Sequence, residues 1–117
     1  MKKLILVTSP PACGKTFVTR KIAKAMPNCV YLDKDTLIIL SKKIFEVAGE
    51  EYNRSSDFFE AQIRDPEYDC VMELAMEALE YNDTVFINAP YTREVRTPGY
   101  MEKLRQVLLK KKNAELV

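Results

Sequence analysis

The stretch that most constrains this chain is residues 9–16, Ser-Pro-Pro-Ala-Cys-Gly-Lys-Thr, together with the segments on either side of it. It differs at one position, Ser9, from the phosphate-binding pattern G-x-x-x-x-G-K-[ST]. The apolar run Leu4–Val7 leads into it, and a helical pattern over residues 15–26 follows it. The pattern requires this context of buried strand, tight loop and helix, so the chain is predicted to open with a strand–loop–helix unit.

The rest of the chain continues the alternation of strands and helices. Strands are predicted at residues 3–8, 29–32 and 84–88, and a fourth is predicted to begin at 114–117. Helices are predicted over 15–26 and 36–48, after a cap at Ser55 or Ser56, from Asp65-Pro66 to Leu79, and after a cap-plus-first-turn signature at Thr97-Pro98. This order predicts parallel strands joined by helical crossovers, in a single α/β domain that spans residues 1–117 with helices on both faces of an open sheet.

Two of the helices carry apolar stripes that are predicted to face the core. The stripes are Val18, Ile22, Ala25 and Met26 in the first helix, and Leu37, Leu40, Ile44, Val47 and Ala48 in the second. The fourth strand lies at the very end of the chain, so we expect an α/β domain that is incomplete at its C-terminus. An open sheet edge there would be a template for a homodimer or for strand exchange.

The composition excludes several classes of function. With 18 basic and 17 acidic residues the net charge is +1, which gives no electrostatic footprint for nucleic acid or an anionic membrane. There is no histidine, which removes Ser-His and Cys-His catalysis. The cysteines Cys13, Cys29 and Cys70 fit neither a disulfide framework nor a zinc site, so a cytoplasmic protein is expected. No apolar run has the length of a signal peptide core or a membrane span.

The loop residues have defined roles if the pattern binds phosphate. Gly14 lets the backbone approach the phosphate, and the N–H groups from Ala12 through Cys13 to Thr16 point at its oxygens at the positive end of the following helix. Lys15 would reach the β and γ phosphates as a compact point charge, and the Thr16 hydroxyl would ligate Mg²⁺. The alternative is a capped helix that follows a strand and binds nothing.

Two aspartates follow the second strand, where an open parallel sheet binds its ligands. We expect this strand to lie beside the first, so that Asp33 and the loop share one site. Asp33 would hold a magnesium-bound water or accept a proton, and Asp35 would orient the substrate or simply cap the next helix. The third strand ends in Asn88, where many nucleotide-binding proteins carry an aspartate; Asn88 would donate to a phosphate or water, or have no role.

Four arginines are candidates for clamping an anionic substrate: Arg54, Arg64, Arg93 and Arg96. Arg93 and Arg96 follow the carboxyl end of the third strand and are therefore better placed than the others. The competing interpretation for each arginine is an exposed surface side chain.

Three features together resemble those of the small P-loop kinases: residues 9–16, the Asp33-x-Asp35 pair, and the third strand ending in Asn88-Ala89-Pro90. The resemblance is to the bacterial AAA-type ATP-binding kinase-like proteins, whose relatives include shikimate kinase, gluconate kinase, chloramphenicol phosphotransferase and zeta toxin. In the order of elements it covers most of the 117 residues.

The resemblance implies a three-layer P-loop nucleotide-hydrolase-like fold, with ATP and Mg²⁺ as ligands and transfer of the γ-phosphoryl to a small-molecule hydroxyl. It implies Lys15 and Thr16 as phosphate and metal contacts, and Asp33 as the base or the holder of a metal-bound water. The chain departs from the family at Ser9 and Asn88, and the family's arginine-bearing lid has no counterpart before Val117. The sequence therefore leaves two hypotheses open, an ATP-dependent small-molecule kinase and a nucleotide-binding module without catalysis.

Overall fold

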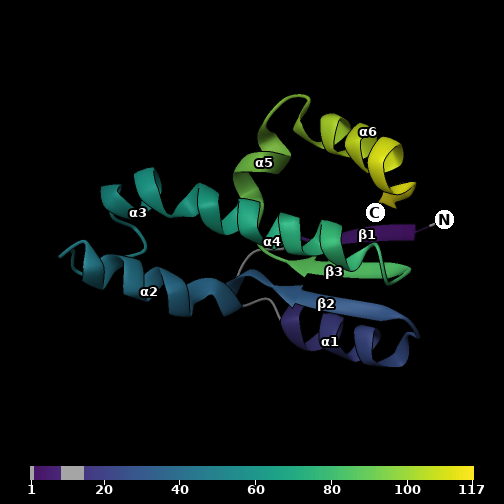
Figure 1. The fold of residues 1–117 in the computed structure, drawn as a ribbon, viewed down its shortest axis with the longest axis horizontal. Helices are drawn as coiled ribbons and strands as arrows, with labels where there is room; N and C mark the ends of the chain where they lie inside the picture. Colours follow the sequence, from purple (N-terminus) through teal and green to yellow (C-terminus); the bar gives the residue numbers. More distant parts are fainter. Residues whose placement is uncertain (1, 9–14) are drawn as a thin grey trace.

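The computed structural model describes residues 2–8 and 15–117. Its sheet has four strands in the order β2-β3-β1-β4, and all neighbouring pairs are parallel (Figure 1). The strands are β1 (Lys2–Val7), β2 (Cys29–Asp33), β3 (Thr84–Asn88) and β4 (Ala114–Leu116). At least one helix lies between each strand and the next along the chain, which confirms the predicted α/β class with parallel strands.

The connecting segments are α1 (Lys15–Ala25), the 3₁₀ turn η1 (Lys34–Leu37), α2 (Ile38–Val47), α3 (Asp57–Gln62), α4 (Arg64–Ala78), α5 (Thr92–Arg96) and α6 (Tyr100–Lys112). Ser56 caps α3 as predicted, since its Oγ accepts from the Phe59 amide at 3.1 Å. The prediction for Thr97 was wrong. Its hydroxyl donates to the Arg93 carbonyl at 2.8 Å at the end of the unpredicted helix α5, and α6 begins only after Gly99.

Strand register sorts the side chains onto two faces of the sheet. Leu4, Val85 and Val30 are in register on one face, and this face carries the main apolar core. Helices α4 and α6 both pack into that core; the buried side chains are Tyr68, Val71 and Ala75 from α4, Leu79 directly after it, and Leu108 from α6. Burying these side chains against the strands is the main stabilising contribution to the domain.

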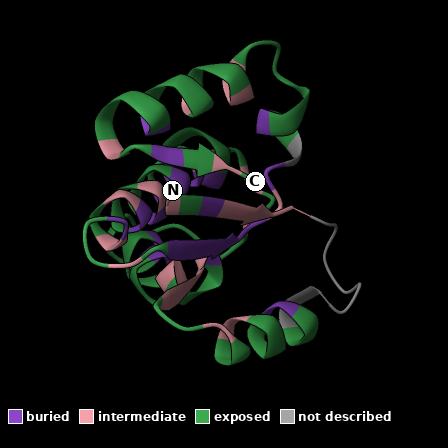
Figure 2. Ribbon diagram, turned by 90° about the vertical axis from the view of Figure 1, so that its right-hand side faces the viewer, coloured by how far each residue is buried: buried purple, intermediate pink, exposed green. Residues whose placement is uncertain are grey.

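Helix α1 lies on the other side of the sheet, and its predicted apolar stripe is not buried. Arg20 of α1 lies over the Tyr31 ring, 5.6 Å from its centroid, and Tyr31 points away from the core that contains Val30. Val18 is 54% exposed and Ile22 is 47% exposed, because α1 packs mainly beside the edge strand β2 rather than over the centre of the sheet. Figure 2 shows α1 largely exposed while β3 is buried along its length.

Helices α2 and α3 project together beyond the carboxyl ends of the strands (Figure 1). We call residues 38–62 the arm. Its Phe45 and Phe59 form a small core together with Ile63, the residue between α3 and α4. The apolar stripe predicted for α2 was on the wrong face, since Leu40 is 64% exposed while Phe45 is buried. The reason is that α2 does not cover the sheet; it faces α3 and α4, and the residues at that contact are buried instead.

Candidate functional site

Three strand ends meet at the carboxyl edge of the sheet. Asn88, the last residue of β3, is in register with Asp33 of β2 on one side and with Val7 of β1 on the other. The chain leaves β1 toward α1 on one face, and leaves neighbouring β3 toward α6, which packs on the opposite face. Such a reversal between adjacent strands is the position at which open α/β sheets bind ligands.

The sheet order corrects one expectation of the sequence. Strand β2 was expected to lie beside β1, but β3 lies between them. Asp33 therefore neighbours Asn88, and Asn88 separates it from the end of β1. The side-chain amide of Asn88 therefore belongs to the middle of this edge, between the ends of β1 and β2.

A chain of hydrogen bonds joins Asn88 to Asp33 through a residue that sequence reasoning missed. The Asn88 side-chain amide Nδ2 donates to the Tyr31 hydroxyl at 2.8 Å, and that hydroxyl donates to Asp33 Oδ2 at 3.3 Å. Tyr31 and Asp33 are two residues apart on one strand, so they lie on the same face. Because side chains alternate between the two faces of a strand, the two-residue spacing from Asp33 could have identified Tyr31 from sequence.

The other oxygen of Asp33 shapes the turn that follows. Asp33 Oδ1 accepts from the Asp35 backbone amide at 2.9 Å, so Asp33 is the cap of η1. The capping role considered for Asp35 therefore belongs to Asp33, and the exposed Asp35 contributes its amide. Asp33 itself is half-buried, with one carboxylate oxygen fixed by the turn and the other by Tyr31. This arrangement holds the carboxylate at the sheet edge in one orientation.

Most of the predicted phosphate loop lies outside the described residues. This applies to Ser9, Ala12, Cys13 and Gly14. Lys15 and Thr16 form the first residues of α1, where only their backbone is described. Over residues 2–8 and 15–117 no three Cys, Asp or Glu side chains gather as a metal centre would require.

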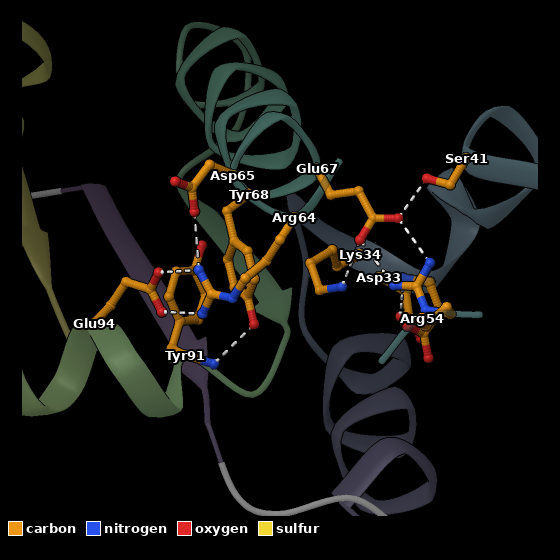
Figure 3. Close-up of polar contacts among 11 residues, drawn as sticks. Asp33, Lys34, Ser41, Arg54, Arg64, Asp65, Glu67, Tyr68, Tyr91 and Glu94 are labelled. Carbon is orange, nitrogen blue, oxygen red and sulfur yellow. Dashed lines mark hydrogen bonds and ion pairs between the residues drawn. The ribbon is translucent and has the colours of Figure 1, made fainter. Parts of the chain in front are cut away.

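Behind the turn lies a buried cluster that we call the Glu67 hub: Glu67, Lys34, Ser41 and Arg54 (Figure 3). Arg54 binds the Glu67 carboxylate with two hydrogen bonds of 2.9 and 2.8 Å, and Lys34 Nζ lies 3.2 Å from Oε1. Burial alone would raise the pKa of Glu67, but the hydrogen bonds from Arg54 and Ser41 and the Lys34 charge together bring that pKa below its ordinary value. Glu67 is therefore an anion that joins η1, the arm and α4.

A second ion pair joins α4 to the segment after β3. Arg64 binds Glu94 through two hydrogen bonds of 3.0 Å, and its Cζ lies 4.5 Å from the centroid of the Tyr68 ring (Figure 3). The Tyr68 hydroxyl accepts from the Tyr91 amide at 3.3 Å. Tyr91 has a left-handed backbone with φ +50° and a fully buried side chain. These contacts fix the path of the chain as it leaves β3.

The four candidate arginines have different environments. Arg54 and Arg64 are held in the internal ion pairs just described, which removes them as free clamps. Arg93 pairs with Glu60 of α3. Arg93 and Arg96 line a surface pocket of about 450 Å³ together with Thr97 and Pro98. Neither Asp33 nor Asp35 is among the described residues that line that pocket.

The hub was not predictable from local sequence. Glu67 lies 33 residues from Lys34 and 26 from Ser41, and a glutamate in the first turn of a helix has an ordinary explanation in the helix dipole. Lys34 looks like a surface lysine between two aspartates, yet it is only 6% exposed. Only the tertiary contacts distinguish both residues from solvated charges.

Comparison with known proteins gives no assignment: no family model and no curated protein matches the chain. The helices among the described residues include none that is long and apolar enough to cross a membrane. The function must therefore be argued from the geometry of the site.

Proposed function

We propose that this protein binds ATP at the loop between β1 and α1 and transfers the γ-phosphoryl group to a hydroxyl of a small molecule. The observation that carries the proposal is the position of Asp33. It ends β2 in register with Asn88, which is in register with the end of β1, the strand that leads into the phosphate-binding pattern. A fixed carboxylate at this edge is what phosphoryl transfer requires close to the phosphate groups.

In this proposal the backbone amides of Ala12, Cys13 and Gly14 hold the phosphates, and Lys15 offsets the negative charge of the β and γ groups. Mg²⁺ would supply charge neutralisation and orientation of the phosphate oxygens. Oxygen ligands suit this ion, and the Asp33 carboxylate, fixed from both sides by Tyr31 and Asp35, fits that chemistry together with the Thr16 hydroxyl. The alternative role for Asp33 is to accept the proton of the attacking hydroxyl.

The residues proposed for the acceptor are Asp35, Arg93 and Arg96. Asp35 is exposed next to Asp33, and the two arginines lie on one turn of α5 beside the pocket they share. Arginine suits an anionic group on the acceptor, because its planar fork can bind a carboxylate or phosphate with two hydrogen bonds.

A nucleotide- or phosphate-binding module without catalysis is the alternative, and one observation favours it. The strand between β1 and β2 ends in Asn88, an amide whose Nδ2 is hydrogen-bonded to Tyr31, so β3 brings no second carboxylate to the edge. Asp33 alone would then serve to bind metal and nucleotide rather than to assist transfer.

Calorimetric titration with ATP, with Mg²⁺ or with a chelator, followed by an ADP-release assay with a panel of small hydroxyl compounds, tests the two functions. The kinase proposal expects ATP binding that the Lys15→Ala substitution weakens strongly, and transfer that Asp33→Asn reduces by orders of magnitude while binding persists. Binding without transfer to any hydroxyl in the panel supports the module. An unchanged ATP affinity in Lys15→Ala contradicts both functions.

A further inference from the structure

Lys34 lies between the two aspartates of the proposed site in the sequence, and its side chain points in the opposite direction from theirs. Lys34 is 6% exposed, whereas Asp33 is half-buried and Asp35 is exposed. Its Nζ lies 3.2 Å from Glu67 Oε1 and 5.0 Å from the centroid of the Tyr68 ring. A buried ammonium is costly unless it is paired, so this contact fixes where residue 34 can sit.

The acceptor of that contact is itself held in place. Arg54 binds both oxygens of Glu67, Ser41 donates to Oε2, and Glu67 is 4% exposed (Figure 3). Lys34, Ser41 and Arg54 come from three different segments, namely η1, α2 and the stretch before α3. The four donor contacts occupy the carboxylate fully, which leaves it little freedom to follow a moving lysine.

We propose that Glu67 is a positioning residue: through Lys34 it fixes the turn 33–35, and so sets the orientation of Asp33 toward the magnesium–nucleotide complex. The assignment of a role at the nucleotide rests on the proposed function. The anchoring of the turn by Glu67 does not, because it follows from the contacts alone. Since the same carboxylate binds Ser41 and Arg54, the orientation of Asp33 and the position of the arm are set together.

Lys34→Met is the variant that separates anchoring from folding. Methionine has nearly the length of lysine and can pack against the Tyr68 ring that the Lys34 ammonium faces, and Glu67 keeps its two hydrogen bonds from Arg54. Lys43→Met is the matched control. It also removes one Lys–Glu ion pair, with Glu46 at 3.1 Å, but the Lys43 side chain is 65% exposed and lies away from the turn.

The first measurement is hydrogen exchange at the Asp35 amide, which donates to Asp33 Oδ1. In Lys34→Met this exchange is expected to rise by about tenfold, while exchange in β3 stays as in the wild type. Lys43→Met should leave both unchanged. An unchanged Asp35 exchange rate in Lys34→Met would overturn the anchoring.

The second measurement is ATP affinity with Mg²⁺ and with a chelator. In Lys34→Met, Mg²⁺ is expected to raise ATP affinity by a factor about tenfold smaller than in the wild type. The ATP affinity measured in chelator is expected to be unchanged. A general structural defect would weaken both affinities equally. If the exchange rate rises and the magnesium-dependent gain stays intact, Glu67 has no positioning role at the nucleotide. If the wild type binds no ATP under either condition, the proposed function fails, and the exchange data still decide whether Glu67 anchors the turn.

Discussion

Asp33 and Asn88 end adjacent parallel strands in register, and the Tyr31 hydroxyl connects their side chains through hydrogen bonds of 3.3 and 2.8 Å. The carboxylate at the edge of the sheet is therefore connected, through Tyr31, to the amide that ends the neighbouring strand. Asn88 is 4% exposed, so the Asn88 end of this connection is shielded from water, while Tyr31 and Asp33 are half-buried.

Removal of the Tyr31 hydroxyl tests this connection. In Tyr31→Phe the ring remains under Arg20, while Asp33 Oδ2 loses its donor. We expect a loss of about fivefold to tenfold in the magnesium-dependent part of ATP affinity, which corresponds to the net contribution of one typical hydrogen bond, about 1 kcal/mol. Calorimetry measures it, and Tyr81→Phe is the control because Tyr81 is 85% exposed. Equal affinities for Tyr31→Phe and the wild type would show that Asp33 needs no orientation by Tyr31.

The Glu67 hub predicts a defined response to acid. The pKa of Glu67 lies below the ordinary value of 4.5, so its contribution to stability is complete above 4.5 and is lost as the pH falls through the lowered pKa. Glu67→Gln leaves Lys34 and Arg54 without their counter-charge and is expected to cost about 3–5 kcal/mol at neutral pH.

Urea unfolding at a series of pH values measures this response. Since glutamine has no proton to gain, the difference in unfolding free energy between wild type and Glu67→Gln should shrink as the solution is acidified below pH 4.5. A difference that stays constant over that range would contradict the assignment of Glu67 as a buried anion.

Two isoleucines test the unexpected exposure of apolar side chains on α2. Ile87 in β3 is fully buried, whereas Ile39 at the start of α2 is 78% exposed. Ile87→Ala is expected to lower the free energy of unfolding by about 2–5 kcal/mol, and Ile39→Ala by no more than about 0.5 kcal/mol. Chemical denaturation of both variants provides the comparison. A large loss in Ile39→Ala would mean that α2 is covered in solution.

The end of α6 offers a stabilising substitution. Asn113 has a left-handed backbone with φ +49°, and its amide donates to the Leu108 carbonyl. Glycine adopts this conformation without a steric cost, so Asn113→Gly should be neutral or raise stability by up to about 1 kcal/mol, while Asn113→Ala should lower it by about 1 kcal/mol. Melting temperatures give the order of the three proteins, and alanine above glycine would contradict this backbone assignment.

The sequence predicted the structure best for a strand that is buried on both faces of the sheet. β3 was predicted with the bounds that it has, because a strand buried on both faces is a continuous apolar run between turn residues. The faces of α1 and α2 were not predictable, because helical spacing shows that Val18 and Leu40 lie on an apolar side but not whether another element covers it.

The residues of the candidate site also differ in how far local sequence predicts them. Asp33 could be proposed as a candidate from local sequence, because it follows an apolar run where parallel sheets bind ligands. Its neighbours were not, since the strand order β2-β3-β1-β4 and the pairing of Lys34 with Glu67 depend on contacts between distant segments. Tyr31 falls between these cases, because strand alternation places it beside Asp33 while only register places it beside Asn88.

The central claim is that phosphate binds at the loop before α1 and that magnesium acts through Asp33. The most direct measurement is a calorimetric ATP titration of wild type and Asp33→Asn, each with Mg²⁺ and with a chelator. The account predicts that both proteins bind ATP equally in chelator and that only the wild type gains affinity from Mg²⁺. Equal gains from Mg²⁺ in the two proteins, or no ATP binding by the wild type, would contradict it.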